Sequence, residues 1–297
     1  MHDKEERRKM NFFTKENIAK LNSMTKYPSI QTFHKMRGGG LAVDESITSD
    51  FPADEDLILS EKLDGCGTRI ICLPLYLEDT EFEAHPRDCV VGSREELLHA
   101  KGDRIINPAL GIVETVLAKV DLDGLLHEIY DTWEANDKIM VFYFETFGGK
   151  TTKGAKNYAG NQTMDIRLFD VGVIDSWQEV IGKTIDQISG WRENGGQRFL
   201  NENTLKFWSD ILHVDLTPRL GVVRDLPRTF DAAKEFIHGM IPRTLCALDE
   251  EARGIPEGIV VRTASRSWIT KMRIEDYDRA IRSRDVMAKI CQRLEIE

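Results

Sequence analysis

The chain of 297 residues carries 50 acidic and 40 basic side chains, which gives it a net charge of −10. Hydrophobic residues make up 41% of it and charged residues 30%, a composition that excludes disordered, collagen-like and fibrous proteins. Because no run approaches the ~18 apolar residues of a membrane helix and the first ten residues are charged, unlike a secretory signal, we expect an intracellular, cytoplasmic protein with no membrane partner.

Strands are predicted from residue 57 onward. The first 56 residues form a mixed lead-in with one helix candidate, Glu16–Leu21. After it come short runs rich in β-branched and aromatic residues and bounded by Gly, Asp, Asn or Pro, which is typical of strands. The runs are LILSE (57–61), RIICLPLYL (69–77), IMVFYF (139–144), IRLFDVGVI (166–174), EGIVVRT (257–263) and SWITKM (267–272).

Helices are predicted between and after these strands. Apolar residues recur at helical spacing in Arg94–Lys101, in an interrupted stretch Asn107–Trp133, in Phe230–Met240 and in the last 24 residues, 274–297. Strands separated by helices without strict alternation indicate an α+β fold with largely antiparallel sheets.

The cysteines indicate neither a disulfide framework nor a zinc site. The five of them, Cys66, Cys72, Cys89, Cys246 and Cys291, include no CxxC pair, and no histidine stands beside them at ligand spacing. We expect reduced thiols, most of them buried.

The segment SEKLDGCGTR (60–69) is the sharpest local feature. Lys62 ends one predicted strand, and a glycine-rich turn leads from it into the next strand. A free lysine with a pKa near ~10.4 is protonated and cannot act as a nucleophile at neutral pH, but desolvation or neighbouring cations can lower that pKa. Taken alone, the segment is more typical of a surface lysine before a glycine-rich turn than of a nucleophile.

Other charged residues also stand at strand ends. Glu145 follows the strand 139–144 and precedes Gly148-Gly149, and Glu257 opens the strand 257–263. Lys271 and Arg273 are two residues apart and therefore point to the same face of a sheet. Together with Lys62 these residues predict one polar cleft.

The order KLDG, FYFETFGG, LFDV, EGIVV and KMR (62–273) resembles the covalent nucleotidyltransferase superfamily of polynucleotide ligases and mRNA capping enzymes. Within it, the chain is similar to the ATP-dependent RNA ligases of the phage and editing-ligase type. The resemblance implies an α+β nucleotidyltransferase (ATP-grasp-like ligase) domain at 57–273, an N-terminal accessory segment at 1–56, a helical tail at 274–297, and a monomer. It also implies ATP and Mg or Mn as cofactors, and RNA with 5′-phosphate and 3′-hydroxyl ends as the substrate.

The resemblance also implies roles for single residues. Lys62 would attack the α-phosphate of ATP and hold AMP as a phosphoramidate, while Lys271 and Arg273 supply cations to the phosphate. The implied ATP-contacting residues are Glu61, Gly65, Arg69, Arg94, Glu145, Phe169, Val260 and Lys271. Glu257 and Asp64 would hold the metal. Lys150, Lys153 and Lys156, spaced by three residues after a glycine pair, would contact the RNA backbone.

Two positions depart from the family pattern: Arg273 stands where lysine is more usual, and Gly67 stands where these ligases often carry asparagine. Three alternatives stay open, namely an ATP-dependent DNA ligase, a GTP-dependent capping enzyme, and a silent module that binds ATP or RNA. The two enzymes usually continue into an OB-fold, for which the 24 residues after Arg273 are too few, so we expect no OB-fold.

Charge is distributed unevenly along the sequence. Cations exceed acids in residues 147–167 and 253–273, so the rest of the chain is more acidic than the net charge of −10 suggests. We therefore expect a basic face around the cleft and a salt-sensitive interaction with RNA.

Overall fold

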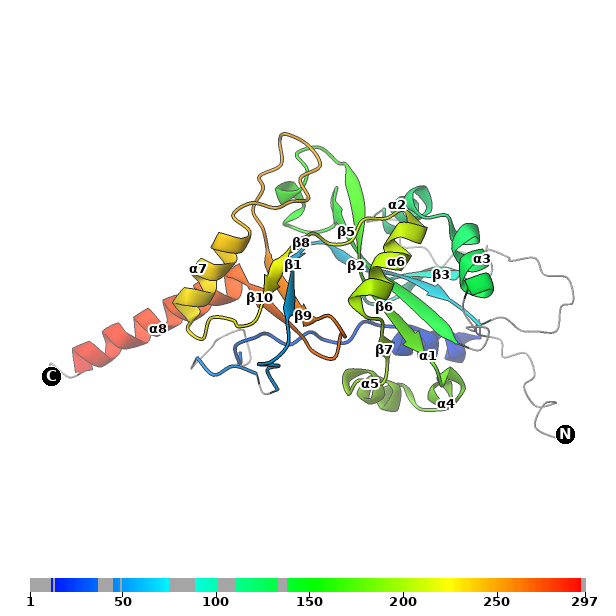
Figure 1. Ribbon diagram of the computed structural model, residues 1–297, viewed down its shortest axis with the longest axis horizontal. Helices are drawn as coiled ribbons and strands as arrows, with labels where there is room; N and C mark the ends of the chain where they lie inside the picture. Colours follow the sequence, from blue (N-terminus) through cyan, green and yellow to red (C-terminus); the bar gives the residue numbers. More distant parts are fainter. Residues whose placement is uncertain are drawn as a thin grey trace, which may run out of the picture.

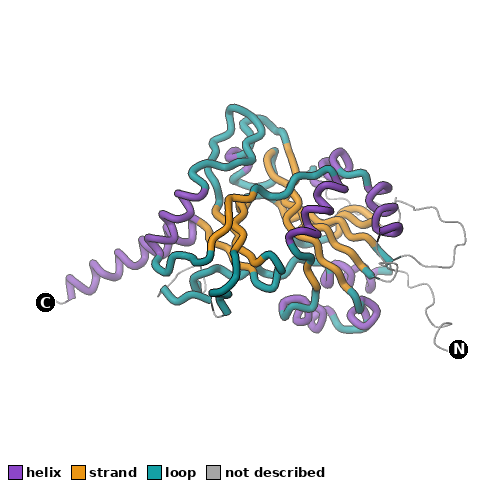
Figure 2. Tube along the Cα trace, viewed as in Figure 1, coloured by secondary structure: helices purple, strands orange, loops and turns teal. Residues whose placement is uncertain are grey.

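The computed structural model describes residues 12, 14–36, 45–48, 50–74, 89–100, 111–132 and 138–294. Its strands form two antiparallel sheets that lie side by side (Figures 1 and 2). The larger sheet has the order β4-β3-β2-β5-β6-β7, with β2 Cys66–Cys72, β3 Cys89–Ser93, β4 Leu97–Ala100, β5 Ile139–Gly148, β6 Met164–Ile174 and β7 Arg198–Phe199. The smaller sheet has the order β10-β9-β1-β8, with β1 Leu57–Lys62, β8 Arg219–Val223, β9 Gly258–Thr263 and β10 Ile269–Arg273.

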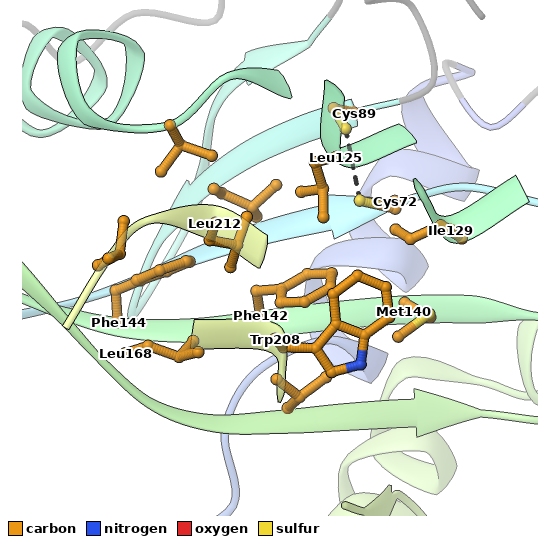
Figure 3. Packing of buried hydrophobic residues seen from close by; sticks show 14 of the residues in the cluster. Cys72, Cys89, Leu125, Ile129, Met140, Phe142, Phe144, Leu168, Trp208 and Leu212 are labelled. Atoms are coloured by element: carbon orange, nitrogen blue, oxygen red, sulfur yellow. Dashed lines mark hydrogen bonds between the residues drawn. The ribbon is translucent and has the colours of Figure 1, made fainter. Parts of the chain in front are cut away.

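Helices cover both faces of the larger sheet (Figure 1). One face carries α2 Ile112–Lys119, α3 Leu122–Thr132 and α6 Glu202–Leu212, and the other carries α1 Lys15–Met24, α4 Trp177–Ile181 and α5 Ile185–Glu193. This explains why residues 139–144 of β5 are apolar without interruption. Phe142 packs toward α6, where it meets Trp208 (Figure 3), while its neighbour Tyr143 faces the α1 side.

The smaller sheet has a core of its own. Leu57 and Leu59 from β1 and Ile259 and Val261 from β9 pack against α7 Phe230–Met240 and the start of α8 Ile274–Leu294. The rest of α8 projects from the body (Figure 1). A short 3₁₀ helix, Ala155–Asn157, lies in the loop between β5 and β6.

The chain passes directly from one sheet to the other after Lys62. β1 belongs to the smaller sheet and β2 to the larger, and only the three residues 63–65 separate them. The larger sheet therefore begins at Cys66, four residues after Lys62 ends the strand of the smaller sheet. The turn 63–65 therefore lies at the junction of the two sheets.

The structure confirms the α+β fold with antiparallel sheets and has a strand at each of the six predicted runs. Residues 75–77, Asn107–Leu110 and Trp133 lie outside the described residues. The predicted helix Arg94–Lys101 is wrong. Residues 93–96 turn the chain and Leu97–Ala100 is strand β4, which pairs with β3.

None of the helices in the described ranges combines the length and apolar composition that crossing a bilayer requires.

Candidate active site

A groove lies where the two sheets meet. Its main chamber has a volume of about 380 Å³, and a second chamber of about 90 Å³ shares part of the wall. The lining comes from both sheets and from residues 27–30 of the N-terminal segment. Both chambers are bordered by Tyr27, Ile30, Lys62, Leu63, Glu145 and Phe169.

Lys62 makes an ion pair at the mouth of the turn. Its Nζ lies 2.7 Å from Oε2 of Glu257, and both side chains keep about a fifth of their surface exposed, at 24% and 20%. Burial raises the pKa of Glu257, and the charge of Lys62 opposes this rise. Arg273 lies 3.9 Å from the other Glu257 oxygen and is held by a two-pronged pair with Asp276.

Glu145 faces the same lysine from the larger sheet. Burial raises its pKa to about 7; Lys62 opposes the rise and Glu257 adds to it. Its Oε1 accepts a hydrogen bond of 3.1 Å from the backbone N–H of Gly65. A Cβ on Gly65 would lie 2.3 Å from the carbonyl oxygen of Thr146, so the turn can approach β5 only with glycine there.

Lys271 adds a second lysine to the groove. Burial lowers its pKa, and the charges of Arg273 and Lys62 lower it further. Its backbone is fixed by the N-terminal segment, because Phe33 N–H donates to the Lys271 carbonyl and Lys271 N–H donates to the Gln31 carbonyl, each at 3.0 Å. Two cations and two carboxylates thus surround Lys62.

Phe169 enters the groove through a bulge in β6. Tyr143 pairs with Asp170 and Phe144 pairs with Leu168, so Phe169 is the extra residue in the ladder. Such a bulge re-aims a side chain, and Phe169 lines both chambers, with Val260 in the wall of the smaller one. The ring of Tyr27 meets Phe169 edge to face at 5.0 Å.

A buried polar network joins the two sheets behind Phe169. Asp170, 1% exposed, accepts a hydrogen bond from Tyr27 at 2.7 Å and one from Arg266 at 2.6 Å, and it pairs with Arg262 of β9 at 3.4 Å. Arg262 also pairs with Glu202 of α6. No sequence motif connects these distant positions, so the network is not predictable from the sequence.

Three predicted ATP-contacting residues have other partners. Glu61 is buried, and its carboxylate accepts hydrogen bonds from Thr244 and from the Leu245 backbone. Arg69 is 2% exposed and donates to Asn22 of α1. Arg94 is exposed at the edge of the groove, 3.6 Å from Glu95.

The three predicted RNA-contacting lysines lie outside the groove lining. Lys150, Lys153 and Lys156 are exposed on the loop between β5 and β6. This loop packs against the Lys62 turn: Thr152 Oγ1 donates to the Asp64 carbonyl, and the Tyr158 hydroxyl accepts from the Asp64 N–H at 2.6 Å.

Comparison with models of protein families identifies the family to which the chain belongs. The RNA ligase family model matches residues 55–281, about three quarters of the chain. A search of curated proteins gave no match.

Solved structures show weaker likenesses. An apo mutant of the Naegleria gruberi RNA ligase has a TM-score of 0.48 and 11% identity, over 86% of this chain and 57% of that one. A mutant of the same ligase with AMP and Mn has a TM-score of 0.44 and 13% identity, over 84% and 62%. An archaeal ATP-dependent RNA ligase has a TM-score of 0.44 and 16% identity, over 85% and 49%. The chain spans less than two thirds of the length of each of these proteins.

Proposed function

The chain belongs to the RNA ligase family, and we propose that it is an ATP-dependent RNA ligase that joins a 5′-phosphate to a 3′-hydroxyl end through AMP bound covalently to Lys62. The observation that carries the proposal is the position of Lys62. It ends β1 at the junction of the sheets, with Nζ 2.7 Å from Glu257 and with Glu145 and Lys271 around it.

In the first step, Lys62 Nζ attacks the α-phosphorus of ATP, and the bond to pyrophosphate breaks as the N–P bond forms. The amine must give up a proton, and Glu257 Oε2 is placed to accept it. The raised pKa of Glu257 makes its carboxylate a better base. Lys271 and Arg273 would balance the charge that develops on the phosphate oxygens.

AMP would lie across both chambers. The aromatic and aliphatic wall made by Phe169, Val260 and Ile30 suits a purine base. Glu145 would accept a hydrogen bond from the ribose. The proposed adenylyltransferase domain is residues 57–273, with 274–297 as its helical tail.

A divalent cation, Mg or Mn, fits the acidic side of the groove. Glu257 and Asp64 both help to raise the pKa of Glu145, so negative charges are crowded there and a cation would relieve the repulsion. In the described part of the chain no three metal-binding side chains converge, so Glu257 and Asp64 would hold the ion largely through water and phosphate oxygens. When bound, it would neutralise charge on the reacting phosphate.

The next two steps use the two RNA ends in turn. An oxygen of the RNA 5′-phosphate attacks the phosphorus on Lys62, and the lysine leaves as the amine. The 3′-hydroxyl of the second strand then attacks the activated 5′-phosphate and AMP departs. Arg94, at the exposed edge of the groove, would meet the RNA end.

To test this function, the protein is incubated with Mg or Mn and ATP that carries a radioactive α-phosphate. A denaturing gel then shows whether the label stays on the protein. The unchanged protein should keep the label, and Lys62→Ala should lose it by at least about 10³-fold. Lys183→Ala, an exposed lysine between α4 and α5, is the control and should label normally.

Each alternative predicts a different result. Labelling by GTP instead of ATP would indicate a capping enzyme, and sealing of nicked DNA but not of RNA would indicate a DNA ligase. Binding of ATP without any retained label would indicate a silent module. Equal labelling of Lys62→Ala would refute the role of Lys62.

A further inference from the structure

Two buried cysteines face each other across the hairpin β2–β3. Cys72 ends β2, Cys89 begins β3, and the two residues are direct partners in the antiparallel ladder. Their Sγ atoms lie 3.4 Å apart, and each residue is 2% exposed (Figure 3). Opposed residues of an antiparallel pair keep their side chains on one face of the sheet, so the register of the hairpin itself holds the two sulfurs together.

The other three cysteines lie in separate places. Cys66 borders the groove, Cys246 belongs to the small core around Tyr158, and Cys291 is exposed on α8. The pair on β2 and β3 instead belongs to the core beneath α3, with Leu125, Ile129 and Met140 (Figure 3). All five cysteines are free thiols, but Cys72 and Cys89 are placed to react with each other.

The geometry is close to that of a disulfide. Opposed Cβ atoms in an antiparallel pair are about 4.5–5.5 Å apart, and a disulfide needs about 3.5–4.5 Å. Rotation of the side chains and a small approach of the strands would therefore allow the bond. The required approach leaves some strain in the bond, and strained disulfides are reduced more easily than relaxed ones.

We propose that Cys72 and Cys89 form a reversible redox site, which a peroxide oxidises to a disulfide that cross-links β2 to β3. One sulfur, as its thiolate, attacks a peroxide oxygen, so the O–O bond breaks, a sulfenic acid forms and one water leaves. The second sulfur attacks the sulfenic sulfur, and the S–S bond forms as the S–O bond breaks and the second water leaves. The two thiols lose two electrons and two protons, and the peroxide gains them.

Burial selects a small oxidant. Both cysteines stand at the ends of their strands, and strand ends open more readily than the middle of a sheet. Hydrogen peroxide is small enough to enter through such an opening, and the second thiol is already in place to complete the bond. The site lies at the opposite end of β2 from the Lys62 turn, so this inference does not depend on the proposed function.

Trypsin separates the two cysteines, which makes the bond directly measurable. It cuts after Arg69, Arg87 and Arg94, so Cys72 is in peptide 70–87 and Cys89 in peptide 88–94. After mild hydrogen peroxide treatment and blocking of the remaining thiols, mass spectrometry should find these peptides joined, lighter than their sum by two hydrogens. Dithiothreitol should separate them again. The linked protein should melt about 5 °C higher, because the bond constrains the unfolded chain.

Cys72→Ala and Cys89→Ala should each abolish the linked peptides and the rise in Tm, and Cys291→Ser, at an exposed cysteine, should keep both. If an alanine variant fails to fold, the peptide map of the unchanged protein still decides the question. Thiols that remain at both positions while Cys291 is oxidised would overturn the proposal. Linkage of Cys72 or Cys89 to Cys66 or Cys246 would overturn it as well.

Discussion

The two glycines that follow Lys62, Gly65 and Gly67, differ in how much space their surroundings leave for a side chain. At Gly65 the added carbon of alanine would collide with the Thr146 carbonyl at 2.3 Å, whereas at Gly67 it would lie 3.7 Å from Cβ of Arg94. Backbone carbonyls in a central strand cannot move aside easily. The first glycine is therefore required by the packing of the turn on β5, and the second is not.

We expect Gly65→Ala to lower the free energy of unfolding by about 1–3 kcal/mol, and to reduce labelling of Lys62 because the turn moves away from Glu145. Gly67→Ala should change stability by less than about 1 kcal/mol. Urea denaturation of both variants measures the difference. Equal losses at the two glycines would contradict the packing argument.

His34 shows how one buried side chain ties elements together. Its ring lies 2.9 Å from the Tyr277 hydroxyl of α8 and 2.9 Å from the Arg228 carbonyl that precedes α7. The nitrogen that faces the carbonyl must donate, and in the neutral ring the other nitrogen accepts from the tyrosine hydroxyl. Burial lowers the pKa of His34 and so favours this neutral ring.

This contact makes stability depend on pH. Because the folded-state pKa of His34 is lowered, its contribution is fully present above the unfolded pKa of about 6.5 and is lost as the pH falls toward the folded value. The Tm should drop between pH 7.5 and 5.5, and His34→Gln should flatten that drop. His238→Gln, exposed on α7, should leave the slope unchanged. A slope that survives His34→Gln would assign it to another group.

Element by element, the six predicted runs are strands, but the sequence predicted a helix where β4 of the hairpin β3–β4 lies. Leu97 and Leu98 in β4 are both buried, so the pattern around them fits a helix as well as a strand with two covered faces. Only pairing with β3, a tertiary contact, decides between the two. The bulge at Phe169 is likewise not predictable from the sequence, because it depends on the pairing of β6 with β5.

The candidate site was predictable in part. The sequence predicts Lys62, Glu145, Glu257, Lys271 and Arg273 at strand ends, and the structure places them around one groove, although β5 continues past Glu145 to Gly148. The sequence did not predict that Arg69 points toward α1. It also did not predict that Tyr27 and Ile30 form part of the groove wall. These residues lie more than 30 positions from the strand residues that they meet, and no spacing rule connects them.

For the whole molecule, the uneven charge predicts how RNA should bind. Lys150, Lys153 and Lys156 are exposed beside the Lys62 turn. Changing all three to glutamine should weaken RNA binding and reduce the slope of log K against log salt by about 2, since each single-strand phosphate contact contributes ~0.7. Labelling of Lys62 by ATP should not change.

The matched control changes Lys15, Lys183 and Lys206 to glutamine, which alters net charge by the same amount on α1, after α4 and on α6. Its salt slope should equal that of the unchanged protein. If both triple variants lose the same slope, overall charge and not the lysine loop governs RNA binding.

The N-terminal segment also determines how the protein can be divided. Residues 31–33 pair with β10, Tyr27 holds Asp170 and Asn22 holds Arg69, although the family match starts at residue 55. A fragment cut at that boundary would lose one wall of its own groove and expose the apolar surface that α1 covers. Inactivity or aggregation of such a fragment would therefore report a broken pocket and would say nothing about the chemistry of Lys62.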